Sequence, residues 1–499
     1  MNIQEALSAL DTLQRKMAAY NHAMGLIYYD GVTAAPSGTA ENRGESMAIL
    51  SEASYELNTC KATEDLLDFL WTQKESLDEA HRRMVFLLRK SLVELRCIPV
   101  EEYVAYQRLI NESEAVWHRA KLENDYPSFA PYIDRIVETN KRFASYIKPE
   151  MDAYEYCLDN YEEGLTCKTC DDFFAALRES LVPLIQKVCA SENKPDTSLL
   201  RFHAPIEKQR SLSDYLMDVL GMDRTHCTIA ETEHPFTTSF TKYDCRITTH
   251  YYEDNLASSM YSVIHEAGHG MYDMGVKDEF AYTCLGGGAS MAVHESQSRF
   301  FENIIGRSRA FVKLIAPKLR ELFPELQTAS DDELYRAFNE SHPSLIRTDA
   351  DELTYCLHIM IRYELEKALF DGRITSAELP AEWNRLYMDY LGIEVPNDKN
   401  GVLQDSHWAG GLFGYFPSYA LGSAYGAQLL TKLMETVDVF AETEAGNLKA
   451  VNEWLHENIW QHGCLYTPGT LMEAAFRGPF DASYYVDYLK AKFEEIYSL

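Results

Sequence analysis

Two histidines lie four residues apart in this chain, and a glutamate directly follows the first. They belong to the segment VIHEAGHGMYDMG, Val263 to Gly275. On a helix, residues four apart lie one above the other, so the imidazoles of His265 and His269 can bind one ion at ~2.0 to 2.1 Å. Glu266 is rotated by about 100° from His265, which places its carboxylate beside the ion rather than on it. The pattern predicts a catalytic metal site, and the alternative is a helix with ordinary buried histidines.

Such a site would activate water. A bound divalent ion brings the pKa of water from far above neutrality to near 7 and polarises a carbonyl oxygen, and Glu266 could accept the proton. The surrounding sequence predicts a helix with Ser258 or Ser259 as its N-cap and Gly275 just past its end. Asp273, one turn after His269, could orient that ligand, although a solvent-facing position is the favoured interpretation.

Two histidines do not complete a catalytic zinc site, which usually has three protein ligands and one open position. The segment CLGGGASMAVHESQSRFFENIIGRS contains a glycine-rich turn at 286–288, a capping candidate at Ser290 and then a second helical pattern. A partner helix antiparallel to the first would bring a carboxylate back to the metal. Glu295 and Glu302 are the candidates on that helix, with His294 as an imidazole alternative. The glycines are not a phosphate loop, because no Gly-Lys-Ser/Thr sequence follows them.

The elements that must position these residues are predicted to be mostly α-helical. Apolar residues recur at spacings of three and four from residue 1 to about 225, as in Asp171 to Ala190, where Asp171 is a plausible N-cap. Between Cys227 and His250 the sequence becomes rich in Thr, Phe, Tyr and Ile, which predicts a small antiparallel sheet with a turn near Lys242 to Asp244. Helical spacing then continues to the end. We expect one domain over 1–499, with lobes around a cleft possible but no assignable boundary.

The charge of the chain excludes several classes of partner. The formal net charge is −31 over 499 residues, which argues against binding to nucleic acid or to anionic membranes. Any anion that the protein binds must therefore be held by specific arginines. The first 24 residues read as an amphipathic helix and not as a targeting signal, and no stretch approaches the ~18 uninterrupted apolar residues of a membrane span. These features predict a soluble, cytoplasmic protein.

Cysteine usage fits the same compartment. The chain has eleven cysteines, an odd number and widely scattered, which is more typical of a reducing environment than of a disulfide framework. Cys167 and Cys170 have the spacing of a redox or zinc motif. No second half of a zinc knuckle accompanies them, so we interpret them as two ordinary thiols at the start of a helix.

Six short motifs together make the resemblance of this chain to a known family specific. With the HEAGH and HESQ segments in view, the sequence resembles the carboxypeptidase Taq family of zinc metallocarboxypeptidases. The motifs occur in family order: HPF at 234–236, DCRIT at 244–248, HEAGH at 265–269, HESQ at 294–297, IRTDAD at 346–351 and GVLQDSHW at 401–408. The N-terminal segment YYDGVTAAPSGTAENRGE is also similar, although Tyr29 stands where a tryptophan is usual. The resemblance covers nearly the whole chain.

The resemblance implies a fold and an activity. The fold would be mostly helical and two-lobed around a deep active-site groove, with a small sheet of about three strands beside the metal, and the protein would usually be a homodimer. The activity would be the zinc-dependent removal of single C-terminal amino acids from peptides, with broad specificity; Co²⁺ or Mn²⁺ could replace Zn²⁺. Family positions assign the third ligand to Glu295, so that zinc is held by His265, His269 and Glu295. Glu266 would act as general base and then as acid.

An exopeptidase of this kind must bind a free carboxylate, and a planar guanidinium does so with two hydrogen bonds. Arg347 is the first candidate, and Arg246 together with His234 is the second. For each arginine the alternative is an internal salt bridge, with Asp351 for Arg347 and with Asp244 for Arg246.

Donors to the developing oxyanion are also expected near the metal. The family-position candidates are His407 and Tyr419, and Tyr425 is close enough in sequence to be confused with Tyr419. Two rival functions remain open: an oligopeptidase or dipeptidyl carboxypeptidase on the same scaffold, and a catalytically silent binding protein that keeps the metal for stability. Glu266 argues against the silent protein, because a structural site has no use for a base beside the ion.

Overall fold

Helices make up most of the structure on both sides of one short β-sheet region. The computed structural model describes residues 2–476 and 478–499. Nine α-helices precede the sheet: α1 (Ile3–Thr33), α2 (Ala40–Thr59), α3 (Lys61–Thr72), α4 (Glu79–Cys97), α5 (Val100–Glu123), α6 (Tyr126–Ile147), α7 (Ala153–Asp159), α8 (Cys167–Ala190) and α9 (Ile206–Leu220), counted over the described residues. This confirms the predicted mostly helical fold. The helix that begins at Cys167 has Thr166 as its N-cap rather than Asp171, because the Thr166 side chain accepts a hydrogen bond from the Thr169 amide.

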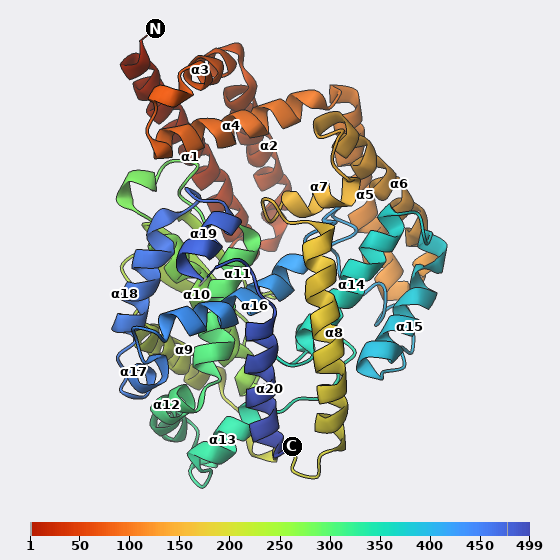
Figure 1. The fold of residues 1–499 in the computed structure, drawn as a ribbon, viewed down its shortest axis with the longest axis vertical. Coiled ribbons are helices and arrows are strands. Elements are labelled where there is room, and N and C mark those ends of the chain that lie inside the picture. Colours follow the sequence, from red (N-terminus) through yellow and green to blue (C-terminus); the bar gives the residue numbers. More distant parts are fainter. Residues whose placement is uncertain (1, 477) are drawn as a thin grey trace.

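The helices after the sheet carry the predicted metal residues and surround them. They are α10 (Leu256–Met274), α11 (Met291–Arg299), α12 (Arg309–Leu322), α13 (Asp331–Phe338), α14 (Tyr355–Phe370), α15 (Leu379–Leu391), α16 (Phe416–Leu433), α17 (Val439–Glu444), α18 (Lys449–Asn458), α19 (Pro468–Ala475) and α20 (Ser483–Tyr497). In Figure 1, α10, α11 and α16 lie near the middle, and the N-terminal helices lie at the opposite end from the C-terminus.

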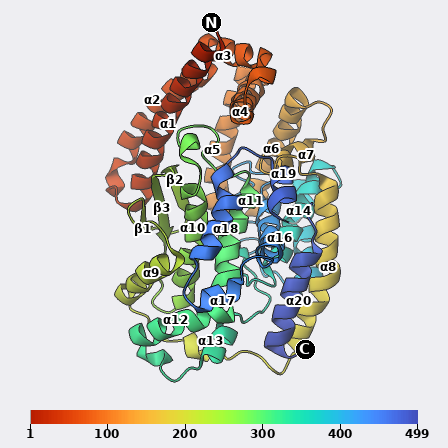
Figure 2. The ribbon, with the colours of Figure 1, turned by 60° about the vertical axis from the view of Figure 1, so that its left-hand side comes forward.

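The sheet has three strands, β1 (Cys227–Glu231), β2 (Thr237–Thr241) and β3 (Asp244–Thr249), in the order β1-β3-β2. It lies between the N-terminal helices and α10 (Figure 2). The predicted turn is present, since only two residues separate β2 from β3 and these strands pair antiparallel. β1 pairs parallel to β3, so the sheet is mixed and not antiparallel throughout. After β1 the chain crosses to the far side of the position that β3 later occupies, and β2 forms there. β3 then lies between β1 and β2.

Alternation along the strands sorts their side chains between two faces. Cys245 and Ile247 face α10, because a Cβ added at Gly270 of that helix would lie 2.9 Å from the Cys245 Sγ. Arg246, between them, faces α1, and its guanidinium lies 5.7 Å from the Tyr29 ring centroid. The sheet therefore presents one set of residues to the metal helix and another to the N-terminal helix.

The two ends of α10 differ from the sequence prediction in detail. Its N-cap is Asn255, whose side chain accepts from the Ser258 amide, rather than Ser258 or Ser259. Gly275 directly follows the last helical residue, as predicted, but it has φ −77° and does not need the left-handed conformation. A Cβ there would lie 2.6 Å from the Trp460 Cβ, so glycine is required by close packing.

Helix α11 has Ser290 as its N-cap, as predicted, and continues into a π-helical turn, Phe300–Gly306. Within that turn the Asn303 carbonyl accepts hydrogen bonds from the Tyr488 hydroxyl at 3.3 Å and the Lys492 ammonium at 3.4 Å, both on α20. The final helix is thus tied to the segment that follows Glu295.

One apolar core extends from Leu109 to Tyr497, and a smaller one is formed by α1, α3 and α4, from Ala6 to Leu92. The prediction of one domain with two lobes around a groove stays a prediction. Each of the eleven cysteines is a free thiol. Within 2–476 and 478–499, none of the helices combines the length and the apolar character that crossing a membrane would require.

Candidate metal centre

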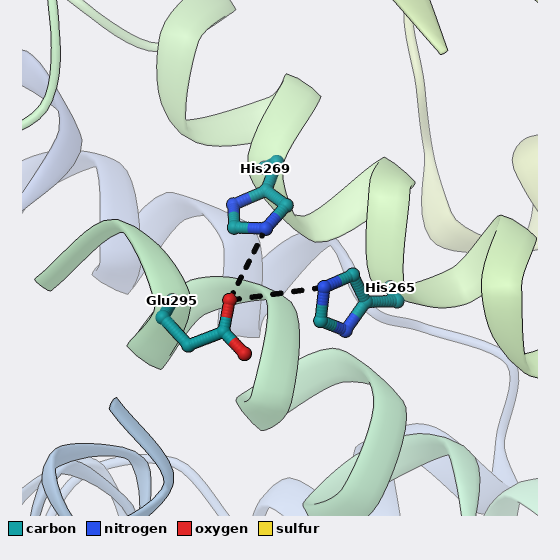
Figure 3. A group of neighbouring side chains, drawn as sticks. All are labelled: His265, His269 and Glu295. Carbon is teal, nitrogen blue, oxygen red and sulfur yellow. Dashed lines mark ion pairs between the residues drawn. The ribbon is translucent and has the colours of Figure 1, made fainter. Parts of the chain in front are cut away.

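Three predicted side chains converge in the middle of the molecule. Figure 3 shows the rings of His265 and His269 directed at the carboxylate of Glu295. The Glu295 Oε2 atom lies 3.4 Å from His269 Nε2 and 3.8 Å from His265 Nε2. One ligand atom from each residue lies within 4.8 Å of the others. Ligand atoms each ~2.1 Å from an ion at tetrahedral angles lie about 3.4 Å apart, so this group has the size of one zinc site.

Two helices that run in opposite directions bring these residues together. His294 of α11 contacts Asp273 near the end of α10, whereas Glu302, further along, contacts His265 near its middle. The antiparallel partner helix predicted from the sequence is therefore present. Glu295 lies opposite both imidazoles and is mostly buried.

Glycines allow this close approach. A Cβ added at Gly268 of α10 would lie 2.7 Å from the Gln297 carbonyl oxygen and the Ser298 Cα on α11. A Cβ at Gly422 of α16 would lie 2.5 Å from the Glu295 Cγ. Since heavy atoms cannot approach that closely, both helices can hold Glu295 in place only with glycine at these positions.

Acid groups and a third histidine lie behind the two imidazoles. The Nδ1 atom of His265 is 2.8 Å from Glu302 Oε2, and the Nδ1 atom of His269 is 2.7 Å from His294 Nδ1. The Nε2 atom of His294 is in turn 3.0 Å from Asp273 Oδ1. Partners of this kind fix the tautomer, because an Nδ1 that carries the proton leaves the Nε2 lone pair free for an ion.

This arrangement separates the alternatives that the sequence left open. Glu302 and His294 contact the Nδ1 atoms of the imidazoles, on the sides away from Glu295, and so do not complete the group of three. The solvent-facing interpretation of Asp273 is wrong: only 14% of its side chain is exposed, and its Oδ2 accepts from the Ser239 hydroxyl at 2.6 Å. Alternation along β2 explains the contact, because Ser239 lies on the face turned to α10.

The local charges favour an ionised Glu295 and a neutral His269, whereas burial is outweighed at His265 by the neighbouring carboxylates, which raise the pKa of His265. Burial opposes the negative charge of Glu295, but Arg299 and the two imidazoles outweigh it and hold the pKa of Glu295 below its ordinary value. Burial, together with the nearby rings of His294 and His265, lowers the pKa of His269. An ionised carboxylate and a neutral imidazole are both competent ligands.

Glu266 lies beside this group, buried, as the helical geometry predicts. Its Oε2 accepts a hydrogen bond of 2.7 Å from the Thr237 hydroxyl of β2. No motif in the sequence distinguishes Thr237, although its position, two residues before Ser239, places it on the same face of the strand. The candidate base is thus held from the sheet side.

Arg347 is almost fully buried but does not pair with Asp351, the partner considered from the sequence. Its Nη2 and Nε atoms lie 2.8 and 3.0 Å from Asp405 Oδ1, and its Nη1 donates to the Tyr355 hydroxyl at 3.1 Å. Asp351 instead accepts from the Ser341 hydroxyl and from the start of α14. Asp405 also binds the buried Arg362, and despite burial these two arginines lower the pKa of Asp405.

His407 and Tyr419 lie beside Arg347. The His407 Nε2 atom is 3.2 Å from the Tyr419 hydroxyl, and the Arg347 guanidinium is 5.3 Å from the Tyr419 ring centroid. Burial and the nearby arginines lower the pKa of His407 to about 4, so its ring is neutral at pH 7. Tyr425 is elsewhere, since its hydroxyl bonds to the buried Glu162.

The second pair of carboxylate-binding candidates does not join this cluster. Arg246 lies on the sheet face turned away from α10, and its Nε and Nη2 atoms are 2.5 and 3.1 Å from Asp244, the internal salt bridge considered as the alternative. His234 is exposed in the loop between β1 and β2. The strand register, which the sequence did not predict, decides the direction of Arg246.

Comparison with known proteins agrees with this architecture. A family model described as Carboxypeptidase Taq (M32) metallopeptidase matches residues 9–493. Carboxypeptidase 1 of Bacillus subtilis strain 168 is 40% identical over 489 residues, which cover 98% of both chains. Thermostable carboxypeptidase 1 of Thermus thermophilus is 33% identical over 509 residues and 100% of both chains.

Solved structures are equally similar. The M32 carboxypeptidase from Deinococcus radiodurans R1 superposes with a TM-score of 0.96 at 34% identity, over 99% of this chain and 100% of the other. A structure of Pyrococcus furiosus carboxypeptidase gives a TM-score of 0.94 at 32% identity, over 99% of both chains.

Proposed function

This chain belongs to the carboxypeptidase Taq (M32) family of metallopeptidases, and from that premise we propose that it is a zinc-dependent carboxypeptidase that releases single C-terminal amino acids from peptides. The observation that carries the proposal is the group of His265, His269 and Glu295, whose size suits one zinc ion and which has Glu266 beside it. The donor set of two imidazoles and one carboxylate is one that catalytic zinc sites use.

The proposed chemistry divides between the ion and the chain. When bound, zinc polarises the peptide carbonyl and lowers the pKa of water. Glu266 accepts the proton of the attacking water and returns it to the leaving amine. The hydrogen bond from Thr237 keeps the carboxylate of Glu266 directed for this transfer. His407 and Tyr419 are proposed to donate to the developing oxyanion, which their contact with each other and their place beside Arg347 support.

Arg347 is proposed to bind the free C-terminal carboxylate of the substrate. Its contacts with Asp405 and Tyr355 use three of the five N–H groups of a guanidinium, and they fix its plane in advance. Asp405 leaves part of the Arg347 guanidinium available to the substrate, because the negative charge of Asp405 is also paired with Arg362. Arg246 and His234 stay a weaker proposal, since Arg246 pairs with Asp244 and His234 is exposed in a loop.

The test combines metal content with hydrolysis of a blocked dipeptide, for the wild type and for Glu266→Gln. We expect one zinc per chain in both proteins and turnover only in the wild type. The same peptide with an amidated C-terminus should not be cut. Unchanged turnover in Glu266→Gln would refute the mechanism. Cleavage of the amidated peptide would favour the oligopeptidase alternative, and release of dipeptides from a longer substrate would favour a dipeptidyl carboxypeptidase.

The family resemblance also supports a homodimer, and eleven free thiols support a reducing, cytoplasmic location. Light scattering coupled to gel filtration tests the dimer: a monomer mass at micromolar concentration would refute it. Fractionation of the source cells tests the location.

A further inference from the structure

Arg299 joins one candidate metal ligand to the carboxylate behind another. Its Nε donates to Glu295 Oε1 at 2.7 Å, and its Nη1 donates to Glu302 Oε2 at 3.2 Å. The same Glu302 oxygen lies 2.8 Å from His265 Nδ1. A single guanidinium therefore contacts the acid groups on two sides of the candidate metal centre.

The two oxygens of Glu295 have different surroundings. Oε2 faces both imidazoles, at 3.4 and 3.8 Å, whereas Oε1 is held by Arg299. The nearby Ser298 hydroxyl lies 2.8 Å from the Glu295 carbonyl oxygen and 3.3 Å from Oε2. It therefore does not take the place of Arg299 at Oε1. A carboxylate can bind an ion through one oxygen or through both, and here one oxygen is already taken.

The plane of Arg299 is fixed from a third direction. Its guanidinium lies 4.4 Å from the centroid of the Tyr355 ring, and only 15% of the side chain is exposed. The Tyr355 hydroxyl in turn accepts from Arg347, the proposed binder of the substrate carboxylate. A flat group with directed donors can stack and form both hydrogen bonds at once, whereas a lysine ammonium cannot.

We propose that Arg299 is a positioning residue for hydrolysis: it limits Glu295 to one oxygen at the metal and so keeps one metal position open for water. The inference rests on the proposed metal site. Glu266, Glu295 and Glu302 place three carboxylates around that site. The single positive charge of Arg299 offsets one of their three negative charges. Removal of the Arg299 charge does not weaken the Coulombic attraction between the carboxylates and a divalent metal ion. The expected loss is therefore of turnover and not of bound metal.

The experiment compares the wild type with Arg299→Met and Arg299→Lys after loading with Co²⁺, a spectroscopic probe of coordination. In Arg299→Met, Glu295 can engage the ion through both oxygens. We expect Co²⁺ affinity, measured by competition with a chromogenic chelator, to be at least that of the wild type. The visible absorption should lose intensity as the coordination number rises, and kcat should fall by about ten- to hundredfold with a smaller change in KM. Arg299→Lys should lie between the two.

Arg309→Met is the matched control, because Arg309, at the exposed start of α12, pairs with Asp332 of α13 and Glu495 of α20 and contacts none of the proposed metal residues. It should keep wild-type values throughout. An unchanged spectrum and kcat in Arg299→Met, or loss of Co²⁺ binding, would overturn the inference. Should Arg299→Met not fold, Arg299→Lys decides by the same criteria. A wild type that binds neither Co²⁺ nor Zn²⁺ would instead refute the proposed function.

Discussion

Replacement of Gly422 by alanine should damage the metal centre from the helix that lies behind it. The added Cβ would be 2.5 Å from the Glu295 Cγ and 2.6 Å from its Cβ. Carbon atoms in contact normally lie ~3.5 to 4.0 Å apart, so Glu295 or α16 must move by about 1 Å. Glu295 is the easier to displace, since α16 is packed along most of its length against the apolar core.

The size of the effect follows from that displacement. An overpacked core position costs about 1 to 3 kcal/mol of stability, which a chain of this size can tolerate without unfolding. A misplacement of ~1 Å in a group that orients the reaction costs about a hundredfold in rate. We therefore expect Gly422→Ala to remain folded, to bind zinc about tenfold or more weakly and to lose about two orders of magnitude in kcat/KM.

Chelator competition measures the zinc affinity, hydrolysis of a blocked dipeptide measures the rate, and circular dichroism checks the fold. Gly44→Ala is the control, because a Cβ at Gly44 in α2 meets no atom within 4 Å. It should leave both parameters unchanged and add up to about 1 kcal/mol of helix stability. If Gly422→Ala keeps wild-type zinc affinity and rate, the conclusion that this glycine sets the position of Glu295 is wrong.

Three further predictions follow from the site and its surroundings. Asp273→Asn should weaken zinc binding by about ten- to hundredfold, because it disturbs the hydrogen-bond chain through His294 to His269; equal chelator-competition constants would contradict this. Arg347→Lys should raise KM by about tenfold or more with a smaller change in kcat, since an ammonium cannot replace the planar fork, and an unchanged KM would exclude the proposed contact. Burial raises the pKa of Glu366 to about 7, so the folded state retains a proton that the unfolded chain has lost; the stability from this group is present at low pH and disappears as pH rises through 7. In urea unfolding, the free energy of unfolding of Glu366→Gln relative to the wild type should therefore rise by about 2 kcal/mol from pH 5 to pH 8. Parallel pH profiles of the two proteins would contradict this.

The spacing of His265, Glu266 and His269 predicted the helix, its imidazole pair and the place of Glu266, because these depend only on helical periodicity. The identity of the third residue was not decided by spacing. Glu295 and Glu302 are seven residues apart and so lie on one face of a helix, and their heights relative to α10 depend on where Gly268 and Gly422 allow the helices to meet. That information lies in packing between segments distant in sequence.

The sheet shows the same limit. Residue composition predicted strands between Cys227 and His250 and the turn before β3, but the parallel pairing of β1 with β3 depends on the path of the connecting loop. The direction of Arg246 and the contacts of Thr237 and Ser239 follow from that register. Arg299 was visible in the HESQSR segment, yet nothing in its spacing distinguishes an arginine that holds a ligand from one exposed on a helix.

The hydrogen bonds from α20 to the Asn303 carbonyl link the order in which the chain is synthesised to the completion of the proposed site. Tyr488 and Lys492 follow every residue of the proposed centre in the sequence, so they leave the ribosome after those residues. The turn that carries Glu302 therefore acquires its full set of hydrogen bonds only after α20 has been synthesised. A nascent chain of this protein is thus expected to complete this part of the proposed site only after α20 has folded and packed against the turn.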